Sequence, residues 1–247
     1  MNQNDVLIDV QNVSKSFGDH DVLTGLSMQV RRGSSDVILG RSGIGKSVLL
    51  KSIVGLLIPE AGSITVKGQQ VIGMKTRELN LLRQNIGYVF QYAALYDSMT
   101  VRENLEFPLR KHKELSEDEI EERVVEQLRL VGLESSIDKM PSELSGGMKK
   151  RVGLARAIIA KPEIVLYDEP TAGLDPITGR EISELIRDLE KHFGITSITV
   201  THDLECTRTV ADTIYILDNG TFTYSGSFDD LQRAEDPLAK AFFLGIT

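Results

Sequence analysis

The chain has 247 residues, of which 41% are hydrophobic and 26% charged, and its formal net charge is −8. These values are typical of one globular unit with a sizeable core, and the acidic balance argues against a protein that coats nucleic acid. The one cysteine, Cys206, excludes an internal disulfide. The sequence has no apolar run near the roughly 18 residues of a membrane span and opens on no signal-peptide pattern. We therefore expect a partner to hold the protein at any membrane where it works.

The N-terminal third has strand patterns. Alternating or short apolar runs predict strands at 6–10, 26–30, 37–39, 63–66 and 86–90. Glycines between them predict turns at Gly18-Asp19 and Arg32-Gly33. The strand at 37–39 is apolar throughout, which is typical of a buried parallel strand. Asp36 enters that strand, and nothing in the sequence explains a carboxylate there.

The segment after the strand at 37–39 fits the phosphate-binding pattern G-x-x-x-x-G-K-S/T and consists of Gly40-Arg41-Ser42-Gly43-Ile44-Gly45-Lys46-Ser47. An apolar helix pattern follows it, so the motif has the strand–loop–helix setting that it requires. Its glycines allow a tight bend that turns backbone N–H groups toward phosphate oxygens, and the helix N-terminus adds its positive dipole end. We expect Lys46 to reach the phosphates and Ser47 to place its hydroxyl on Mg²⁺. The protein is predicted to bind a nucleoside triphosphate.

Helical patterns replace the strands between residues 92 and 160. The segment Ser116-Glu117-Asp118-Glu119 is a capping box, and an apolar stripe follows it at helical spacing. Strand patterns return at 164–167, 197–200 and 213–217, and Asp218-Asn219-Gly220-Thr221 has a hairpin signal. The chain is predicted to be an α/β nucleotide-binding core interrupted by a helical insert.

Two carboxylates, Asp168 and Glu169, end the strand pattern at 164–167. In phosphate-loop enzymes the strand beside the loop presents an Asp to the Mg²⁺ shell, and Asp168 fits that role. Glu169 would lie near the γ-phosphate and polarise an attacking water as general base. Two acids after an apolar run are also common at solvated strand ends, and the phosphate loop upstream favours the chemical interpretation.

The segment Leu144-Ser145-Gly146-Gly147-Met148 points to a family. Its serine can cap the helix that follows, and its two glycines leave backbone N–H groups open to an anion. Upstream of the two carboxylates, it resembles the signature of ABC transporter ATPases. Further residues resemble that family's motifs in the family's order: Phe17 the aromatic that stacks on adenine, Gln91 the sensor of Mg²⁺ and γ-phosphate, Asp175 the carboxylate that crosses to the partner subunit, and His202 the switch histidine. His20 is interpreted as a solvated side chain.

The resemblance covers nearly the whole chain and implies its fold. It implies a single domain, residues 1–247, with an α/β phosphate-loop NTPase core and an antiparallel β subdomain from residues 1–91 and 161–247. Residues 92–160 would form a helical subdomain with the signature.

The same resemblance implies the cofactors ATP and Mg²⁺ and a homodimer that works head to tail. The phosphate loop of one subunit is completed by Ser145, Gly146 and Gly147 of the other. The implied metal ligands are Ser47, Gln91 and Asp168, and the implied catalytic residues are Glu169, His202 and Gln91.

The resemblance also implies a place and partners. The protein would lie on the cytoplasmic face of the inner membrane, bound to a multi-spanning permease whose short helix enters a groove at Tyr92, Ala93, Ala94, Leu95 and Tyr96. Three stretches, 90–105, 140–148 and 168–179, resemble the ATPases of Mce-type phospholipid transport more closely. Many ABC signatures have Gln at the position of Met148, and the Mce-type group shares the Met. A lipid-binding Mce-domain protein is then a further expected partner, and nucleic acid is not.

Two other functions stay open. A polar-solute importer ATPase would share every catalytic motif. A soluble ABC ATPase acting as a clamp in DNA repair, translation or cluster assembly would share the site, but residues 92–160 hold no sustained heptads such as the coiled coil of a repair clamp needs. The phospholipid transporter is the favoured hypothesis.

Overall fold

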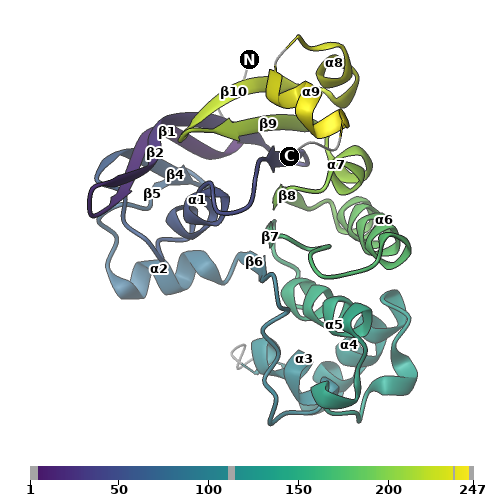
Figure 1. The fold of residues 1–247 in the computed structure, drawn as a ribbon. Helices are drawn as coiled ribbons and strands as arrows, with labels where there is room; N and C mark the ends of the chain where they lie inside the picture. Colours follow the sequence, from purple (N-terminus) through teal and green to yellow (C-terminus); the bar gives the residue numbers. More distant parts are fainter. Residues whose placement is uncertain (1–4, 111–114, 236, 245–247) are drawn as a thin grey trace.

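The computed structural model describes residues 5–110, 115–235 and 237–244. Its strands form two sheets, as Figure 1 shows. The smaller sheet has the spatial order β2-β1-β4-β5 and is antiparallel throughout. Its strands are β1 (Val6–Phe17), β2 (His20–Arg31), β4 (Ala61–Val66) and β5 (Gln69–Gln70).

The larger sheet has the spatial order β10-β9-β3-β8-β7-β6 and is parallel except for β10 at one edge. Every residue of the three strands in and beside its centre is buried, as expected for parallel strands covered on both faces. The six strands are β3 (Ser35–Leu39), β6 (Ile86–Val89), β7 (Ile164–Asp168), β8 (Thr196–Thr201), β9 (Thr213–Asp218) and β10 (Thr221–Gly226).

The helices lie in three places. Figure 1 shows α3, α4 and α5 gathered beyond β6 and β7, away from the antiparallel sheet, whereas α1 lies between the two sheets and α6 and α7 lie beside the larger one. The bounds are α1 (Lys46–Ile53), α2 (Thr76–Arg83), α3 (Val101–Leu109), α4 (Glu117–Leu130), α5 (Gly146–Ile158), α6 (Pro176–Phe193), α7 (Leu204–Val210), α8 (Phe228–Arg233) and α9 (Pro237–Leu244). Two short 3₁₀ turns, η2 (Glu134–Ser136) and η3 (Pro141–Glu143), connect α4 to α5.

Hydrophobic clusters cover both faces of the larger sheet. Successive residues of β3 alternate between the faces: Val37 belongs to the cluster that includes α5 and α6, Ile38 to the one that includes α1 and the antiparallel sheet, and Leu39 to a third that includes α8 and α9. The phosphate-binding segment therefore leaves a strand fixed on both sides, and its position is set by the whole core.

Several predicted elements are present and some were missed. The capping box at Ser116 is formed, since its hydroxyl accepts from the Glu119 backbone N–H and the Glu119 carboxylate accepts from the Ser116 N–H. Strands β1 and β2 are longer than their predicted cores because register shifts break the alternation along them. The sequence patterns did not reveal α2, whose apolar face is short: Leu82 is its one buried residue, and Leu79 packs against the same cluster. The boundaries predicted at residues 92 and 160 stay a prediction.

Asp36 is buried in β3, between β8 and β9. Its Oδ1 atom has no hydrogen-bond partner among the described residues. Burial raises the pKa of this carboxyl to about 7, and the neighbouring charge of Asp212 acts in the same direction. The structure thus accommodates the carboxylate by favouring its neutral form.

Candidate nucleotide site

The phosphate-binding segment joins β3 to α1 at the carboxyl end of the larger sheet. The Gly40 N–H donates to the Thr201 carbonyl at 3.2 Å, which ties the segment to β8. Gly45 caps α1 with a φ of 111°, and a Cβ there would lie 2.5 Å from Val22 Cγ1. Only glycine fits this position, because both the backbone angle and the approach of β2 exclude a side chain.

A cavity of about 370 Å³ opens above this segment. It brings together residues from distant parts of the chain, and most of those predicted for the site are among them. Its lining is Phe17, His20, Val22, Ser42, Gly43, Gly45, Lys46, Ser47, Val48, Gln91, Glu169 and His202. The predicted residues Gly40, Arg41 and Asp168 contact Lys46 or Ser47 from outside the lining, and Ile44 packs against the hydrophobic cluster of α1.

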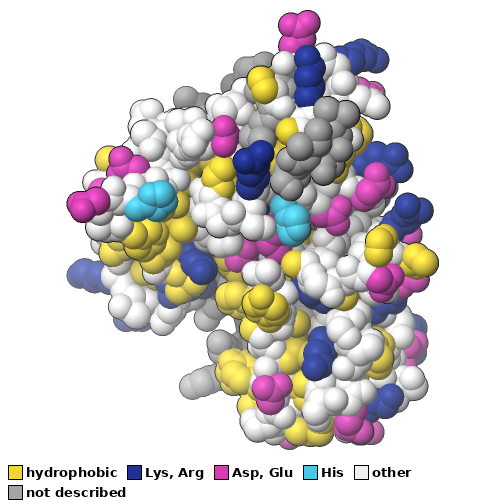
Figure 2. Space-filling model, viewed as in Figure 1, with side chains coloured by type: hydrophobic (Ala, Val, Ile, Leu, Met, Phe, Trp, Pro, Cys, Tyr) yellow, Lys and Arg dark blue, Asp and Glu magenta, His cyan; other side chains and the backbone are white. Residues whose placement is uncertain are grey.

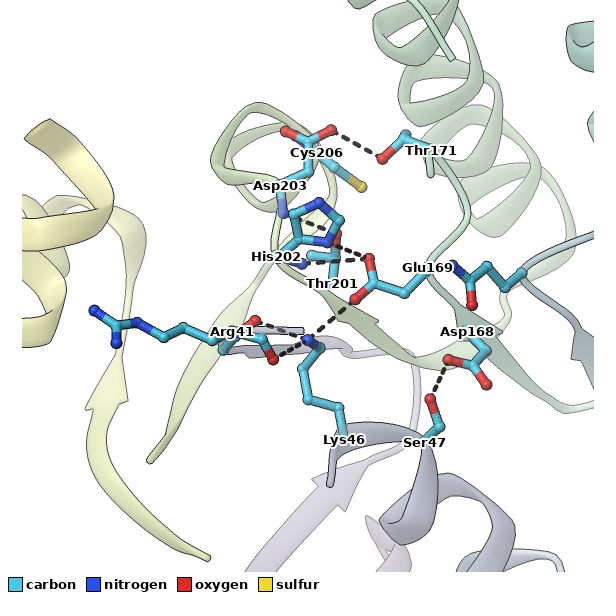
Figure 3. A network of polar contacts seen from close by, with 12 residues as sticks. Arg41, Lys46, Ser47, Asp168, Glu169, Thr171, Thr201, His202, Asp203 and Cys206 are labelled. Carbon is cyan, nitrogen blue, oxygen red and sulfur yellow. Dashed lines mark hydrogen bonds and ion pairs between the residues drawn. The ribbon is translucent and has the colours of Figure 1, made fainter. Parts of the chain in front are cut away.

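Lys46 is surrounded by oxygen atoms, as Figure 3 shows. Its Nζ donates to the carbonyls of Gly40 at 2.7 Å and Arg41 at 2.9 Å, and lies 3.0 Å from Glu169 Oε1. The side chain is buried. A buried ammonium needs such partners, and the carboxylate supplies the opposite charge. An anion that enters the cavity must therefore compete with Glu169 for this lysine.

Glu169 links Lys46 to the histidine. Its Oε2 atom lies 2.8 Å from His202 Nδ1, on the other side of the carboxylate from the lysine (Figure 3). Its φ is 50°, an angle that costs a non-glycine residue about 1–3 kcal/mol. The Glu169 N–H donates to the Val200 carbonyl at 2.9 Å, which anchors the strained residue to β8. The turn aims the carboxylate into the cavity.

Two oxygen groups that could bind a metal stand side by side: the Ser47 hydroxyl in the lining of the cavity and the Asp168 carboxylate behind it. The Ser47 hydroxyl donates to Asp168 Oδ1 at 2.6 Å, and the Tyr88 hydroxyl donates to Asp168 Oδ2 at 3.2 Å. A hydroxyl beside a carboxylate suits Mg²⁺, which takes one or two protein oxygens and fills its other positions with water and phosphate. The described residues contain no cluster of three or more His, Cys, Asp or Glu that holds a metal by itself. The donor set therefore fits Mg²⁺ brought in with a nucleotide.

Lys150, on α5, is a site residue that the sequence analysis missed. Its buried Nζ donates to the carbonyls of Gln91 at 2.6 Å and Glu169 at 3.1 Å. Burial lowers its pKa to about 8, although the charges of Glu169 and Asp168 act in the opposite direction. The side chain thus ties α5 to two residues of the cavity. The signal was a lysine on the buried side of the helix that follows the signature.

The signature segment lies away from this cavity. Ser145 caps α5 by accepting from the Met148 N–H at 3.3 Å, and Ser145 and Gly146 are exposed. A Cβ on Gly147 would lie 2.8 Å from Thr178 Cγ2, so α6 packs against that glycine. None of the three lines the cavity around Lys46.

Asp175 also lies outside the cavity. Its Oδ1 atom accepts from the backbone N–H groups of Ile177 and Thr178, both at 3.1 Å, and so caps α6. Hydrogen bonds from the Thr178 hydroxyl and backbone hold the pKa of this exposed carboxyl below its usual range. Ser145, Gly146, Gly147 and Asp175 are therefore the predicted site residues that the chain does not bring to its own phosphate loop.

A second cavity, of about 850 Å³, lies beside β6 and is called the β6 groove below. Figure 2 shows hydrophobic side chains gathered on the surface where β6 meets the helices α3 and α5. The groove is lined by Asn80, Arg83, Gln84, Ile86, Gly87, Tyr88, Phe90, Ala94, Tyr96, Phe107, Pro108, Arg110, Arg156, Ala157, Ala160 and Pro162.

Of the five residues predicted to line such a groove, Ala94 and Tyr96 do so. Tyr92 is exposed, Ala93 is buried and Leu95 packs against the core. The difference has a local cause: Ala93 and Ala94 have φ values of 59° and 48°, and Arg156 donates to both of their carbonyls. This reversal turns Ala93 inward onto α5.

Among the described residues, no helix is both long and apolar enough to cross a bilayer.

Comparison with known proteins identifies the family. The pattern of the ABC transporter family matches residues 23–172. The chain is 41% identical over 240 residues to the "Probable ribonucleotide transport ATP-binding protein mkl" of Mycobacterium leprae, covering 97% of this chain and 69% of that protein. It is 40% identical over 245 residues to the "Intermembrane phospholipid transport system ATP-binding protein MlaF" of Haemophilus influenzae, covering 99% and 92%.

Among solved structures, the chain resembles the dimeric ATP-binding cassette MJ0796 in a post-hydrolysis state with ADP and Pi. The TM-score is 0.81 at 32% identity, and the match covers 89% of this chain and 98% of that one. This similarity confirms the predicted α/β phosphate-loop fold. The chain belongs to the ABC transporter family, as one of its ATP-hydrolysing subunits.

Proposed function

We propose that the chain is the ATPase of a transporter that moves phospholipid, working as a homodimer with a multi-spanning permease and an Mce-domain protein. The observation that carries this proposal is the similarity to MlaF, which extends over 92% of the MlaF chain and so includes the segments that form the β6 groove. The protein would lie on the cytoplasmic face of the inner membrane, held by the permease.

ATP would bind in the cavity around Lys46. The backbone N–H groups at the start of α1 and the ammonium of Lys46 meet the phosphates. Phe17 stands at the mouth, where its ring is 50% exposed and available to stack on adenine. Lys15 Nζ lies 5.2 Å from the centroid of that ring, and this cation–π contact steadies it.

Mg²⁺ would be held by Ser47 and Asp168, with Gln91 at the edge of the same cavity, and when bound it offsets charge on the phosphates. The remaining steps belong to the side chains. When the γ-phosphate pairs with the ammonium of Lys46, that lysine leaves the Glu169 carboxylate. The carboxylate is then free to accept a proton from water. His202, on the other side of Glu169, keeps the carboxylate and the water aligned.

The second half of the site would come from another copy of the chain. Ser145 and Gly146 are exposed and Gly147 is partly exposed at the N-terminus of α5, which suits the γ-phosphate of a partner subunit. Asp175, the exposed cap of α6, would cross the same interface. ATP held from both sides closes the dimer, and loss of the γ-phosphate opens it.

A polar-solute transporter is the second candidate, and the observation behind it is the similarity to the ribonucleotide transport protein, which covers less of that protein than the similarity to MlaF covers of MlaF. Both candidates use the same ATPase chemistry, so the partners and the cargo must distinguish them.

The test is a pull-down of Glu169→Gln from native membranes in MgATP, with partners and co-purified lipids identified by mass spectrometry. A permease with an Mce-domain protein and enriched phospholipid is the expected result. A permease with a solute-binding protein would support the second candidate, and soluble partners alone would refute transport.

A further inference from the structure

Tyr88 lies between the β6 groove and the floor of the nucleotide cavity. It is on β6, the edge strand of the larger sheet, and its ring lines the groove. The ring lies 4.4 Å from that of Phe90, centroid to centroid, and Phe90 lines the same groove. Tyr88 is only partly buried, so a partner that occupies the groove meets this pair of rings.

The other end of the side chain contacts the nucleotide site. The Tyr88 hydroxyl donates to Asp168 Oδ2 at 3.2 Å, while Ser47 donates to Oδ1 at 2.6 Å. The two oxygens of one carboxylate are thus fixed from opposite sides, Ser47 by the phosphate loop and Tyr88 by the edge strand. A phenol is protonated at neutral pH, so Tyr88 is a permanent donor there.

We propose that Tyr88 is a positioning residue that orients Asp168 for the metal and transmits occupancy of the β6 groove to it. The proposal rests on the proposed function, in which Asp168 holds Mg²⁺ and a permease helix enters the groove. A rigid aromatic side chain suits the task, because a shift of its ring moves its hydroxyl by a similar distance. Outer hydrogen bonds of this kind set the orientation of a ligand and hence the affinity for the metal.

The first experiment measures metal affinity and not activity. Mn²⁺, in place of Mg²⁺, is titrated by electron paramagnetic resonance into the subunit with a non-hydrolysable ATP analogue. Tyr88→Phe removes the hydroxyl and keeps the ring, and we expect it to weaken Mn²⁺ binding by about tenfold. Binding of the analogue in EDTA stays at the wild-type level.

Tyr215→Phe is the matched control. Tyr215 is likewise partly buried on a strand and packs against a phenylalanine, Phe222, with ring centroids 5.1 Å apart, but it lies outside both the nucleotide cavity and the β6 groove. Its variant should bind Mn²⁺ as the wild type does. Circular dichroism and the urea midpoint confirm that each variant is folded.

Asp168→Asn separates failure of this inference from failure of the proposed function. Wild-type Mn²⁺ affinity in Asp168→Asn would remove Asp168 from the metal site and overturn the metal-binding part of the proposed function, and this inference with it. Weak binding in Asp168→Asn with wild-type affinity in Tyr88→Phe would overturn the role of Tyr88 alone.

A second experiment tests transmission from the groove, on the complex with the permease. We expect the wild-type subunit to change its Mn²⁺ affinity when it joins the complex, and Tyr88→Phe to lose most of that change. An equal change in both, or none in the wild type, would overturn the link to the groove.

Discussion

Two glycine-containing segments at helix N-termini, Gly40–Ser47 and Ser145–Gly147, lie in opposite surroundings. In the first, the lysine is enclosed: Lys46 is buried, and three oxygen atoms of its own chain contact its ammonium. The second is open: Ser145 and Gly146 are exposed, and the Ser145 hydroxyl accepts only from the helix that it caps.

The difference is the one that a site divided between two copies of the chain would require. Both segments offer backbone N–H groups and a positive dipole end to an anion. The first segment lines the nucleotide cavity together with a carboxylate and a histidine that suit catalysis. The second segment does not line that cavity. We therefore propose that one chain builds the binding half of a site and presents the other half to a second copy, and the solved structure of the related cassette MJ0796 is dimeric.

The largest expected effect is on hydrolysis. Glu169→Gln should lower the rate by about 10²–10⁴-fold, because the amide cannot accept the proton of the attacking water. ATP binding should remain, and the variant should collect as an ATP-bound dimer. Steady-state ATPase assays and gel filtration in MgATP measure the two effects. Glu121→Gln, which alters a partly exposed carboxylate paired with Arg102 outside the nucleotide cavity, is the control. Near wild-type turnover in Glu169→Gln would exclude this residue as the base.

The second expected effect separates ATP binding from ATP hydrolysis in a variant of the Ser145–Gly147 segment. Ser145→Arg should leave ATP affinity of the single subunit within about twofold of wild type, since Ser145 lies outside the nucleotide cavity. It should lower hydrolysis by about 10²-fold or more, because a bulky cation replaces a small cap where the partner's γ-phosphate would sit. Ser142→Arg, at an exposed serine just upstream, is the control. A parallel loss of ATP affinity in single subunits would contradict the division.

A third effect concerns the strand beneath the phosphate loop. The folded chain keeps a proton on Asp36 up to about pH 7, whereas the unfolded chain loses it near the ordinary value of 3.8. The free energy of unfolding therefore declines as pH rises across that window. Asp36→Asn should reduce this decline by about 2 kcal/mol, since one pKa unit corresponds to about 1.4 kcal/mol and the site relaxes. Urea unfolding at pH 5 and pH 8 measures it, and an unchanged decline would contradict the prediction.

The smallest expected effect is on the affinity of a single subunit for ATP at the cavity around Lys46. Phe17→Ala should weaken ATP binding to the single subunit by about five- to tenfold, the energy of one aromatic stack. Calorimetric titration measures it. Ile177→Ala removes another exposed apolar side chain, which lies outside the cavity, and should leave the affinity for ATP unchanged. Equal affinities of the wild type and Phe17→Ala would mean that adenine binds elsewhere.

The sequence predicted the parts of the site that follow from local pattern. A strand–loop–helix motif and a strand ending in acids locate Lys46, Ser47, Asp168 and Glu169, and parallel strands bring such ends to one edge of a sheet. The order of further motifs predicted that Phe17, Gln91 and His202 belong to the same site, and all three line the cavity.

The rest depends on contacts that no local pattern records. Lys150 reaches Gln91 and Glu169 only because α5 packs under both loops. His20 is exposed, as expected of a solvated side chain, but the sequence did not predict that it also lines the nucleotide cavity, where β2 follows β1. Ala93 turns inward because Ala93 and Ala94 both have left-handed backbone conformations, which alanine rarely adopts.

The most direct test of the division is a mixed dimer of Lys46→Ala and Ser145→Arg subunits. Each variant alone should be inactive, since every composite site in its homodimer carries a defect. In the mixed dimer, one site combines the intact phosphate loop of the Ser145→Arg subunit with the intact signature of the Lys46→Ala subunit. We predict that mixing restores ATP hydrolysis. Absence of activity in mixed dimers that form and bind ATP would contradict a site shared between two copies.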